Sequence, residues 1–292
     1  MDYTIENEYL KVTVTTFGAQ LKSVVRKCDG VEHMWQADPD VWGYHAPILF
    51  PFTGKVKDDV IEVEGKTYPA PKHGFARLME FTLIQQEPQK IVFGITHTPE
   101  TLSQFPFAFR LRSIFRLEGD CVLHTLEVVN EDDKSMPFGI GFHPAFAIPF
   151  DDNHSFRDYE LRFDRLESPM CINCMPNGLV TGELYYLGAN IQSIPVDEHL
   201  FDNDSHCMVN LSSGTLGLYE KDTGRGVVCS IEGFPYTLIW SKPGEPQFIC
   251  IEPWFSIPSA EKGSRKWEEK PAAAVLEPGK HWNRTLRMQF VR

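Results

Sequence analysis

The sequence has few basic residues and no basic block. Among its 292 residues, 28 Lys and Arg stand against 40 Asp and Glu, for a net charge of −12. Nucleic acids and anionic membrane surfaces are bound by clustered Lys and Arg, so neither is expected as a partner. No apolar run approaches the roughly 20 residues that cross a bilayer. The start, "MDYTIENEYL", lacks the basic and apolar segments of a signal peptide, which predicts a cytoplasmic protein.

Cysteines are present in an odd number, seven, and form no small disulfide framework. Most lie in apolar surroundings, as in "RGVVCSIEG" and "QFICIEPW", which is typical of buried thiols kept reduced in a cytosol. Cys171 and Cys174 form the one pair at CxxC spacing, and the turn sequence "MPNG" follows them. A structural zinc site needs a second such pair, and a redox CxxC needs a helix after a strand. We therefore interpret the pair as part of a loop and predict no metal.

Helical periodicity is scarce. The best candidate is residues 259–269, and Gly263 weakens it. Alternation of apolar and polar residues dominates instead, which is typical of half-buried strands. The alternating segments are 9–17, 20–27, 90–98, 109–119, 121–131, 215–221, 225–233, 236–242, 248–252 and 284–291. Gly and Pro, 21 of each, are spread without a linker-like cluster. We predict one all-β domain over residues 1–292, a large antiparallel sandwich of two curved sheets with few short helices.

Motifs for the commonest nucleophilic and nucleotide-dependent chemistries are missing as well. The chain has no GxSxG elbow, Walker loop or GxGxxG, so no cofactor is expected. Of its ten histidines, His97, His124 and His281 lie in alternating segments and are interpreted as surface or core residues. His199 and His206 lie in "DEHLFDNDSH", which has the composition of a metal site. Asp, Asn and Ser gather in turns for backbone reasons alone, and we favour that interpretation.

Two histidines differ from the rest in their neighbours. His73, in "PAPKHGFAR", follows a Pro-rich approach and is predicted on a rigid turn at the start of a strand. His143, in "FGIGFHPAF", follows Gly139 and Gly141, which allow close approach of a backbone or a ligand. Pro144 then restricts the backbone directly after the His143 ring. Such constraints serve a side chain whose geometry must be held, although local sequence alone favours a core role for both rings.

Glu252 ends an almost continuous apolar strand in "QFICIEPWFSIPS". Burial raises the pKa of a carboxylic acid towards the range of a working general base. The alternative is a glutamate paired with a strand-end lysine or with backbone N–H groups. Two constrained histidines and one buried carboxyl group, without a metal motif, together suit proton transfer on a neutral substrate.

The segments "KHGFAR", "GFHPAF" and "CIEPW", in this order and at these spacings, resemble the aldose 1-epimerase (galactose mutarotase) superfamily, most closely its LacX-like branch. The resemblance covers nearly the whole chain, including "GAQLKSVV", "PILFPFTGKV" and "LEPGKHWNRTLRMQF". It implies the β-supersandwich of the mutarotases with an open cleft, and interconversion of the α and β anomers of an aldose. It also implies a small-molecule sugar as partner and a monomer or homodimer.

The resemblance implies roles for three residues. Glu252 is the general base that takes the proton of the C1 hydroxyl, and His143 is the general acid that protonates the ring oxygen O5. The C1–O5 bond opens, the aldehyde turns about C1–C2, and closure reverses both transfers. His73 orients the sugar near O5. This scheme needs a protonated His143 beside an ionised Glu252, so we expect negative charge near the imidazolium. Trp254 is expected to bind substrate, since aromatic rings stack on the apolar faces of sugars.

Two positions depart from the pattern of the galactose-specific relatives. Where those carry an arginine, this chain has Lys55, which lacks the bidentate fork of a guanidinium. The aspartate that grips a sugar hydroxyl matches Asp204 best, and Asp202 competes for the assignment. These departures leave the identity of the sugar open.

Arg77, in "HGFAR", suggests a second substrate class, because relatives that act on hexose 6-phosphates hold the phosphate with arginines. Arg77 and Lys55 could bind a phosphate together. No larger cluster of arginines surrounds these motifs, so a hexose-6-phosphate 1-epimerase is the second choice. An ion pair with Glu80 is the structural alternative for Arg77. The third hypothesis is a non-catalytic carbohydrate-binding protein on the same scaffold.

Overall fold

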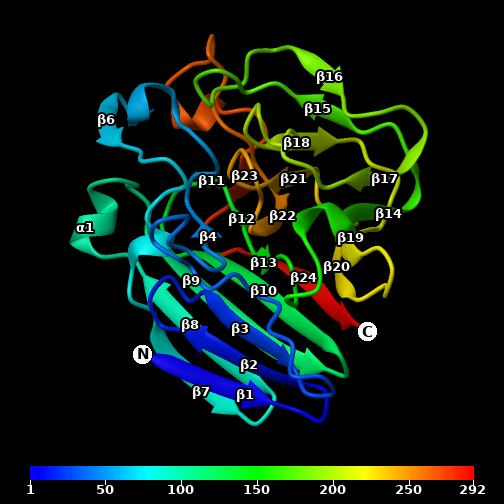
Figure 1. Ribbon diagram of the computed structural model, residues 1–292. Helices are drawn as coiled ribbons and strands as arrows, with labels where there is room; N and C mark the ends of the chain where they lie inside the picture. The colour runs from blue at the N-terminus through cyan, green and yellow to red at the C-terminus, as the bar shows by residue number, and fades with distance from the viewer.

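The alternating segments form strands of two large antiparallel sheets and of one three-stranded sheet (Figure 1). The computed structural model describes all 292 residues. In spatial order, the nine-stranded sheet comprises β17 (Ile191–Pro195), β14 (Tyr159–Glu167), β19 (Thr215–Glu220), β20 (Gly226–Ser230), β24 (His281–Val291), β10 (Cys121–Asn130), β9 (Phe109–Glu118), β8 (Lys90–Thr96) and β7 (Thr82–Glu87). The all-β prediction is confirmed, and every predicted strand is present.

The eight-stranded sheet contributes β22, which bears Glu252 and Trp254, to the site described below. Its strands are β16 (Leu184–Tyr186), β15 (Met170–Ile172), β18 (His206–Val209), β21 (Tyr236–Trp240), β22 (Phe248–Trp254), β12 (Gly141–Phe142) and β4 (Ile48–Leu49), with β13 (Ala145–Ala147) paired to β22. Smaller sheets are formed by β1 (Asp2–Glu6), β2 (Leu10–Thr15) and β3 (Leu21–Arg26), by β5 (Val60–Val63) and β6 (Lys66–Pro69), and by β11 (Met136–Phe138) and β23 (Ala274–Leu276).

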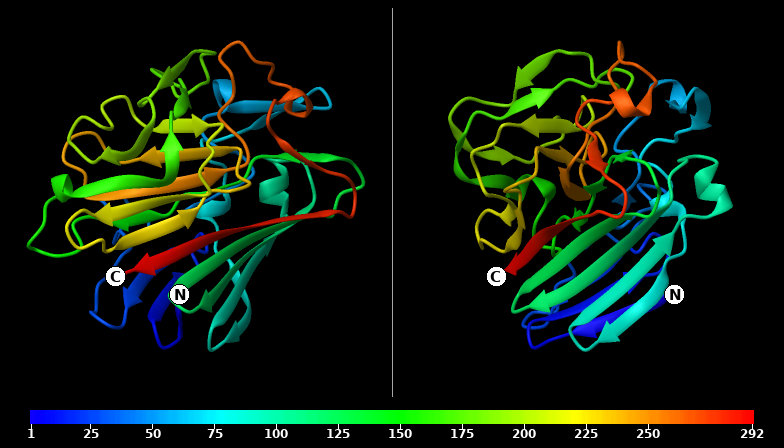
Figure 2. Two further views of the ribbon diagram at one scale, coloured as in Figure 1. Left: turned by 90° about the vertical axis from the view of Figure 1, so that its right-hand side faces the viewer. Right: turned by 180° about the vertical axis from the view of Figure 1, so that it is seen from behind.

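The nine-stranded sheet is the layer that the other sheets share (Figures 1 and 2). The sheet β1–β2–β3 packs on one end of it, where the rings of Tyr3 and Phe93 meet at 5.8 Å. The eight-stranded sheet packs on it further along, where Phe142 meets the ring of His124 at 5.0 Å. One continuous core of 59 buried apolar residues joins these layers. Because alternate residues of each strand point into this core, the period-two pattern was a reliable guide to the fold.

Of the three histidines predicted in alternating strands, His124 and His281 lie in strands and His97 does not. His124 is buried in β10, stacked on Phe115 at 4.1 Å and 2.9 Å from the Ser113 hydroxyl through Nε2. His281 begins β24 and is exposed, and His97 lies just beyond the end of β8. They are core and surface residues, as the sequence predicted.

The helical prediction was wrong in detail. Within 259–269 only a 3₁₀ turn forms, η4 (Trp267–Glu269). Tertiary contacts fix this segment instead: Trp267 is buried and its Nε1–H donates to the Pro137 carbonyl at 2.7 Å. The single α-helix is α1 (Pro99–Leu102), which begins at the N-cap Thr98. Short 3₁₀ turns η1 (Lys57–Asp59), η2 (Ala76–Leu78) and η3 (Phe156–Asp158) complete the elements. None of the helices is long and apolar enough to cross a membrane.

The seven cysteines are all free thiols, and five of them are buried. The interpretation of Cys171 and Cys174 as loop was half correct. Cys171 lies within β15 and is buried, whereas Cys174 lies in the loop that follows. The turn sequence "MPNG" marked where the strand ends but not where it begins.

Candidate active site

A single cavity of about 270 Å³ contains all the residues that the sequence analysis selected for catalysis or substrate binding. This volume lies near the lower end of the range for small-molecule sites. The selected residues on its wall are Lys55, His73, Arg77, His143, Asp204, Glu252 and Trp254. They come from segments up to about 200 positions apart, so the fold assembles the site from β22 and from loops around it.

Glu252 lies in β22, a strand whose seven residues are all buried. Its neighbour across the ladder is Leu238 of β21, and its side chain is 1% exposed. The carboxyl oxygen Oε2 has no hydrogen-bond partner and lies 3.2 Å from Nε2 of His143. Burial raises the pKa of Glu252 well above its ordinary value, and the positive charge of Lys72 opposes this only in part. The alternative of a Glu252 paired with lysine or with backbone N–H groups is not what the structure shows.

His143 lies in the two-residue connection between β12 and β13 and is 7% exposed. The close approach predicted at Gly141 is made by Trp254: a Cβ on Gly141 would lie 2.5 Å from Cδ1 of the indole. The ring of Trp42 stacks on the imidazole at 5.1 Å, and Trp240 meets it edge-on at 5.7 Å. The imidazole is therefore held between aromatic walls, with Glu252 at one edge.

Burial shifts the pKa values of His143 and Glu252 in opposite directions. Burial lowers the pKa of His143 to about 3, with the positive charges of Lys72 and Arg77 adding to the effect. Burial also raises the pKa of the Glu252 carboxyl well above its ordinary value, which favours its protonated form. An imidazolium supported by negative charge was expected from the sequence, but the charges that shift the pKa of His143 are the positive ones of Lys72 and Arg77. Without such compensation, desolvation favours the neutral form of each partner.

His73 lies in a turn between β6 and η2, not at the start of a strand as predicted. Its φ of +66° is in the left-handed region, which is uncommon for a residue with a Cβ. The turn is held by Gly54, whose N–H donates to Nδ1 of His73 at 3.1 Å and whose carbonyl accepts from the His73 N–H at 3.0 Å. Burial lowers the pKa of His73 well below its ordinary value. The ring is thus neutral with its proton on Nε2, and that N–H is the donor available to a ligand.

The two competing aspartates occupy different environments. Asp204 is on the cavity wall, in a turn just before β18. Asp202 is exposed and pairs with His199 at 3.0 Å, away from the cavity lining. His206 is buried with Nε2 2.6 Å from the Leu200 carbonyl and Nδ1 2.8 Å from the Tyr185 hydroxyl, so both ring nitrogens already have protein partners. The structure thus favours the turn interpretation of this segment.

Arg77 forms no ion pair with Glu80. Its Nη2 donates to the Lys72 carbonyl at 3.1 Å, its guanidinium lies over the ring of Tyr44 at 5.1 Å, and its Nε has no partner. Lys55 is half-buried on the cavity wall. Both cations therefore remain available to a ligand.

Sequence reasoning missed six further wall residues that bear chemistry. They are Trp42, Lys72, Cys174, Cys207, Trp240 and Lys242. Lys72 could have been found because it precedes His73 in "KHGF". Trp240 and Lys242 were inside or next to a predicted strand, but nothing in "YTLIWSK" indicates that it borders a cavity.

One group of side chains in the site has the composition of a metal centre. His143, Cys250 and Glu252 each offer a ligand atom, and these atoms lie within 4.8 Å of one another. Metal ligands must be deprotonated to bind. Burial raises the pKa of the Cys250 thiol and that of the Glu252 carboxyl well above their ordinary values, which favours the protonated form of both groups. This protonation opposes metal binding and favours proton transfer as the chemistry of the cluster.

Comparison with known proteins identifies the class to which this site belongs. The family model for aldose 1-epimerase matches residues 1–289, and the chain belongs to that family. It is 32% identical to the plasmid-encoded protein LacX of Lactococcus lactis subsp. lactis over 289 residues, 95% of each chain. It superimposes with a TM-score of 0.95 on a galactose mutarotase related enzyme from Lactobacillus acidophilus, at 30% identity over 100% of this chain and 98% of that one. A galactose mutarotase-like protein from Lactobacillus casei gives 0.92 at 31% identity, over 99% of both chains.

Proposed function

We propose that the protein is an aldose 1-epimerase that interconverts the α and β anomers of a sugar by acid–base catalysis. The observation that carries the proposal is the 3.2 Å contact between Glu252 and His143 at a sugar-sized cavity. Family membership supports the reaction class. Glu252 Oε2 and His143 Nδ1 are buried without hydrogen-bond partners, so neither atom is used in a hydrogen bond that holds the fold.

The contact between the two groups suits the positions of the reacting oxygens. O1 and O5 of an aldopyranose are both bonded to C1, so neighbouring acid and base groups can reach both at once. Glu252 takes the proton of the O1 hydroxyl while His143 protonates O5, and the C1–O5 bond breaks to give the open aldehyde. Rotation about C1–C2 and reversal of both transfers give the other anomer. Each group contributes roughly 10² to 10⁴ in rate.

Ring opening changes which member of the pair, Glu252 or His143, carries the titratable proton. The reactive pair is a carboxylate and an imidazolium, and after ring opening it is a carboxylic acid and a neutral imidazole. The second arrangement is the one that burial favours. Desolvation therefore supports the proton transfers that open the ring, and reclosure returns the pair to its first arrangement.

Binding is assigned to the other wall residues. The neutral His73 presents its Nε2–H as a donor to a ring or hydroxyl oxygen, and the Asp204 carboxylate accepts from a sugar hydroxyl. Trp254 offers an indole face and an Nε1–H that has no protein partner. Donors and acceptors that are left without protein partners in a cavity are the groups that a polar ligand satisfies.

The test is polarimetry on freshly dissolved α-D-glucose and α-D-galactose. We expect the protein to accelerate mutarotation and Glu252→Gln to lower the catalysed rate about 10²- to 10⁴-fold, since Gln keeps the shape but cannot take the proton. Glu8→Gln, at an exposed position, is the matched control and should retain full activity. Full activity of Glu252→Gln would remove the proposed base.

A non-catalytic sugar-binding protein is the competing function. The aromatic rings of Trp42, Trp240 and Trp254 on the cavity wall are what such a protein would also need. It does not need a carboxyl group and an imidazole in contact, which is why we favour the enzyme. Saturable sugar binding without faster mutarotation, across a broad panel of aldoses, would support the binding protein.

A further inference from the structure

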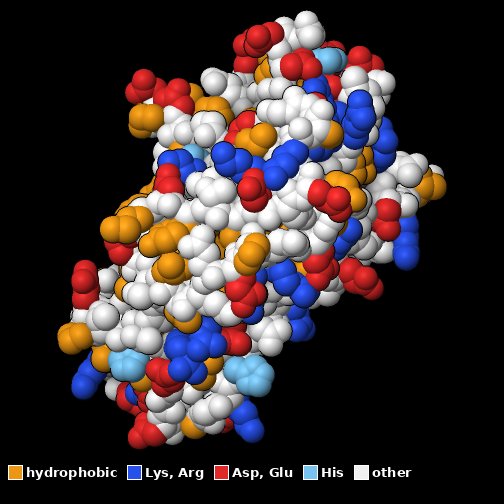
Figure 3. All heavy atoms as spheres, turned by 90° about the horizontal axis from the view of Figure 1, so that it is seen from below, with side chains coloured by type: hydrophobic (Ala, Val, Ile, Leu, Met, Phe, Trp, Pro, Cys, Tyr) orange, Lys and Arg blue, Asp and Glu red, His pale blue; other side chains and the backbone are white.

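Lys270 is a half-buried lysine whose ammonium group contacts only neutral partners. By contrast Lys266, at the start of η4, pairs with Glu269 at 3.1 Å. On the face of the molecule seen in Figure 3, Lys and Arg side chains likewise lie at the surface among Asp and Glu side chains. Burial lowers the pKa of Lys270 to about 8. Taking an ammonium group out of water is unfavourable unless it is hydrogen-bonded, so the contacts of Lys270 need an explanation.

The ammonium group of Lys270 binds the backbone of the segment that follows β22, the strand of Glu252. Its Nζ donates to the carbonyl of Ile257 at 2.8 Å and to that of Pro258 at 3.3 Å. Neither carbonyl accepts another hydrogen bond from the protein. Hydrogen bonds from an ionised donor are stronger than those between neutral groups. One ammonium group that holds two consecutive carbonyls therefore fixes the course of the chain at this point.

Pro258 and Ser259 transmit this constraint to the segment that follows β4. The ring of Pro258 lies against Gly54, where a Cβ would approach the proline Cγ to 2.4 Å. Next to it, the N–H of Ser259 donates to the Lys55 carbonyl at 2.9 Å. The Pro258 ring thus closes one side of Gly54 and fixes the position of its backbone.

Gly54 in turn holds the imidazole of His73. Its N–H donates to Nδ1 of His73 at 3.1 Å, which leaves the Nε2–H as the donor available to a ligand. Lys270 therefore reaches this ring through two residues of the cavity wall, Pro258 and Gly54. Lys270 itself is not on that wall.

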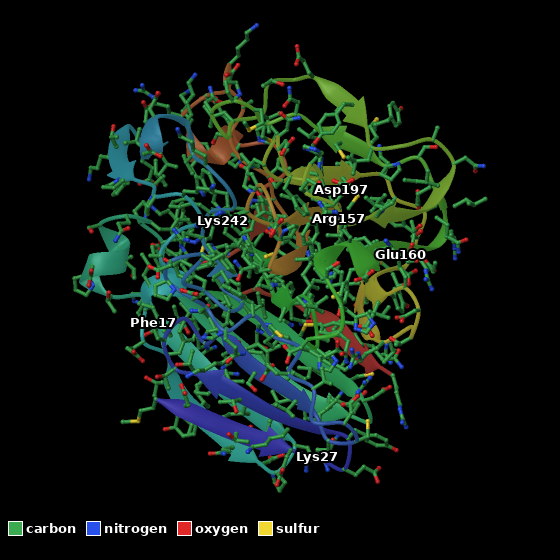
Figure 4. The ribbon with its side chains drawn as sticks, in the orientation of Figure 1. Phe17, Lys27, Arg157, Glu160, Asp197 and Lys242 are labelled. Carbon is green, nitrogen blue, oxygen red and sulfur yellow. The ribbon has the colours of Figure 1, made fainter.

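The backbone of Lys270 is also held in place. Its N–H donates to the Trp267 carbonyl at 3.2 Å, and the buried Trp267 ring packs on Phe52 at 5.0 Å. The N–H of Glu62 donates to the Arg265 carbonyl at 2.8 Å, which ties this part of the chain to β5. In Figures 1 and 4 the orange ribbon around η4 accordingly lies beside the blue ribbon of β5 and β6. Supports held in this way can fix the geometry of a functional side chain.

We propose that Lys270 is a positioning residue that holds Pro258 against Gly54 and so orients the Nε2–H of His73 towards the substrate. The inference rests on the proposed epimerase activity and adds to its machinery a residue outside the cavity. Displacement of a binding group by about 1 Å can lower a rate about 100-fold, so a support of this kind has a measurable effect.

The first experiment measures anomer exchange by exchange NMR, on the aldose that the parent protein exchanges fastest. Lys270→Met keeps the aliphatic stem and removes the donor, and we expect kcat/KM to fall about 10- to 100-fold. Lys270→Arg keeps charge and donors and should retain most of the activity. Lys262→Met, at an exposed position in the same part of the chain, is the matched control and should leave kcat/KM unchanged. Should Lys270→Met not fold, Lys270→Gln replaces it under the same criteria.

A double-mutant cycle with His73→Asn separates positioning from a merely structural role. Asn tolerates the left-handed backbone of His73 but lacks the Nε2–H. If Lys270 acts through His73, Lys270→Met should lower kcat/KM about tenfold or more in the parent and less than about twofold in the His73→Asn protein. Equal losses in both backgrounds would overturn the inference, as would full activity of Lys270→Met.

A measurement without substrate distinguishes this failure from failure of the proposed function. NMR of protein labelled with ¹⁵N-histidine reports the tautomer of each imidazole, and His73→Asn identifies the signals of His73. We expect the Nε2–H tautomer alone in the parent and a mixture of tautomers in Lys270→Met. If no sugar exchanges faster, the epimerase is wrong and this spectrum decides the inference. A mixture in Lys270→Met would then support the positioning of His73, and an unchanged tautomer would overturn it.

Discussion

Two clusters of ionisable side chains in this molecule look alike in composition and differ in how their members are paired. One is the cavity cluster of His143, Cys250 and Glu252, and the other is the group of Asp151, His154 and Glu220. Each has a histidine with acidic groups near it. We refer to the second, together with Arg225 and Tyr159, as the Arg225 cluster.

The Arg225 cluster supplies a partner for nearly every polar atom. Glu220 is fully buried, and its carboxylate accepts from Arg225 Nη2 at 2.8 Å and from the Tyr159 hydroxyl at 2.6 Å. Arg225 also binds Asp151, which lies 2.7 Å from Nδ1 of His154. Burial alone would raise the pKa of Glu220, but hydrogen bonds from Arg225, Thr223 and Tyr159 outweigh it and lower the pKa. The guanidinium of Arg225 supplies the positive charge that these carboxylates need.

The cavity cluster lacks such partners. His143 Nδ1, Glu252 Oε2 and Trp254 Nε1 are buried and unpaired, and the pKa values of His143 and Glu252 move towards the neutral forms. Leaving buried polar groups unpaired costs stability, so a protein keeps them where a ligand will use them. The residue types of a cluster therefore do not tell whether it is structural or functional. Whether each buried polar atom has a hydrogen-bond partner does tell.

The comparison predicts the largest effect for His143→Asn. Anomer exchange should fall about 10²- to 10⁴-fold, because Asn cannot donate a proton to O5. The free energy of unfolding should fall by less than for Arg225→Met below, because the imidazole loses packing against Trp42 and Trp240 but no hydrogen bond through Nδ1. Polarimetry and chemical denaturation measure the two quantities. A strong loss of stability with catalysis retained would make His143 a structural residue and break the contrast.

The reverse outcome is expected for Arg225→Met. Removing one partner of a buried ion pair leaves Glu220 uncompensated, so the free energy of unfolding should fall by about 3 kcal/mol. Anomer exchange should be unchanged at temperatures where the variant is folded. Arg116→Met is the control, because its pair with Glu118 is exposed on both sides and contributes below about 1 kcal/mol. An Arg225→Met protein as stable as the parent would show that the Arg225 cluster is not a structural one.

The sequence was a good guide to the strands because burial on one face imposes a period of two. It was also a good guide to Glu252, which ends an apolar strand, and to His143, which glycines and a proline constrain. It could not show that Trp42 stacks on His143 or that Lys242 faces the same cavity, because these contacts join loops far apart in the chain. Nor could it give the protonation of the pair, which depends on how completely the folded layers exclude water.

A smaller effect is expected for Trp42→Leu. Trp42 is a positioning residue: its ring stacks on His143 at 25° between planes, and its carbonyl accepts from Trp35 Nε1 at 2.8 Å. An aromatic face stabilises a cation by about 1–2 kcal/mol in a desolvated site, so kcat should fall about tenfold. KM should change less than kcat, and Trp42→Phe should restore most of the rate. A change confined to KM would indicate that Trp42 only binds sugar.

The smallest effect concerns His154 and appears in the pH dependence of stability. Its hydrogen bond to Asp151 raises the pKa of His154 above its ordinary value, and Asp222 and Glu220 add to the effect. A group with a raised pKa in the folded state stabilises fully below its unfolded pKa of about 6.5 and loses that contribution as pH rises through the folded pKa. The difference in melting temperature between the parent and His154→Asn should therefore shrink between pH 6 and pH 8. Since His143 is neutral over this whole range, His143→Asn should show a difference that does not vary with pH. A pH-dependent difference for His143→Asn and a constant one for His154→Asn would invert the comparison, because it would place the charged histidine in the cavity and the neutral one in the Arg225 cluster.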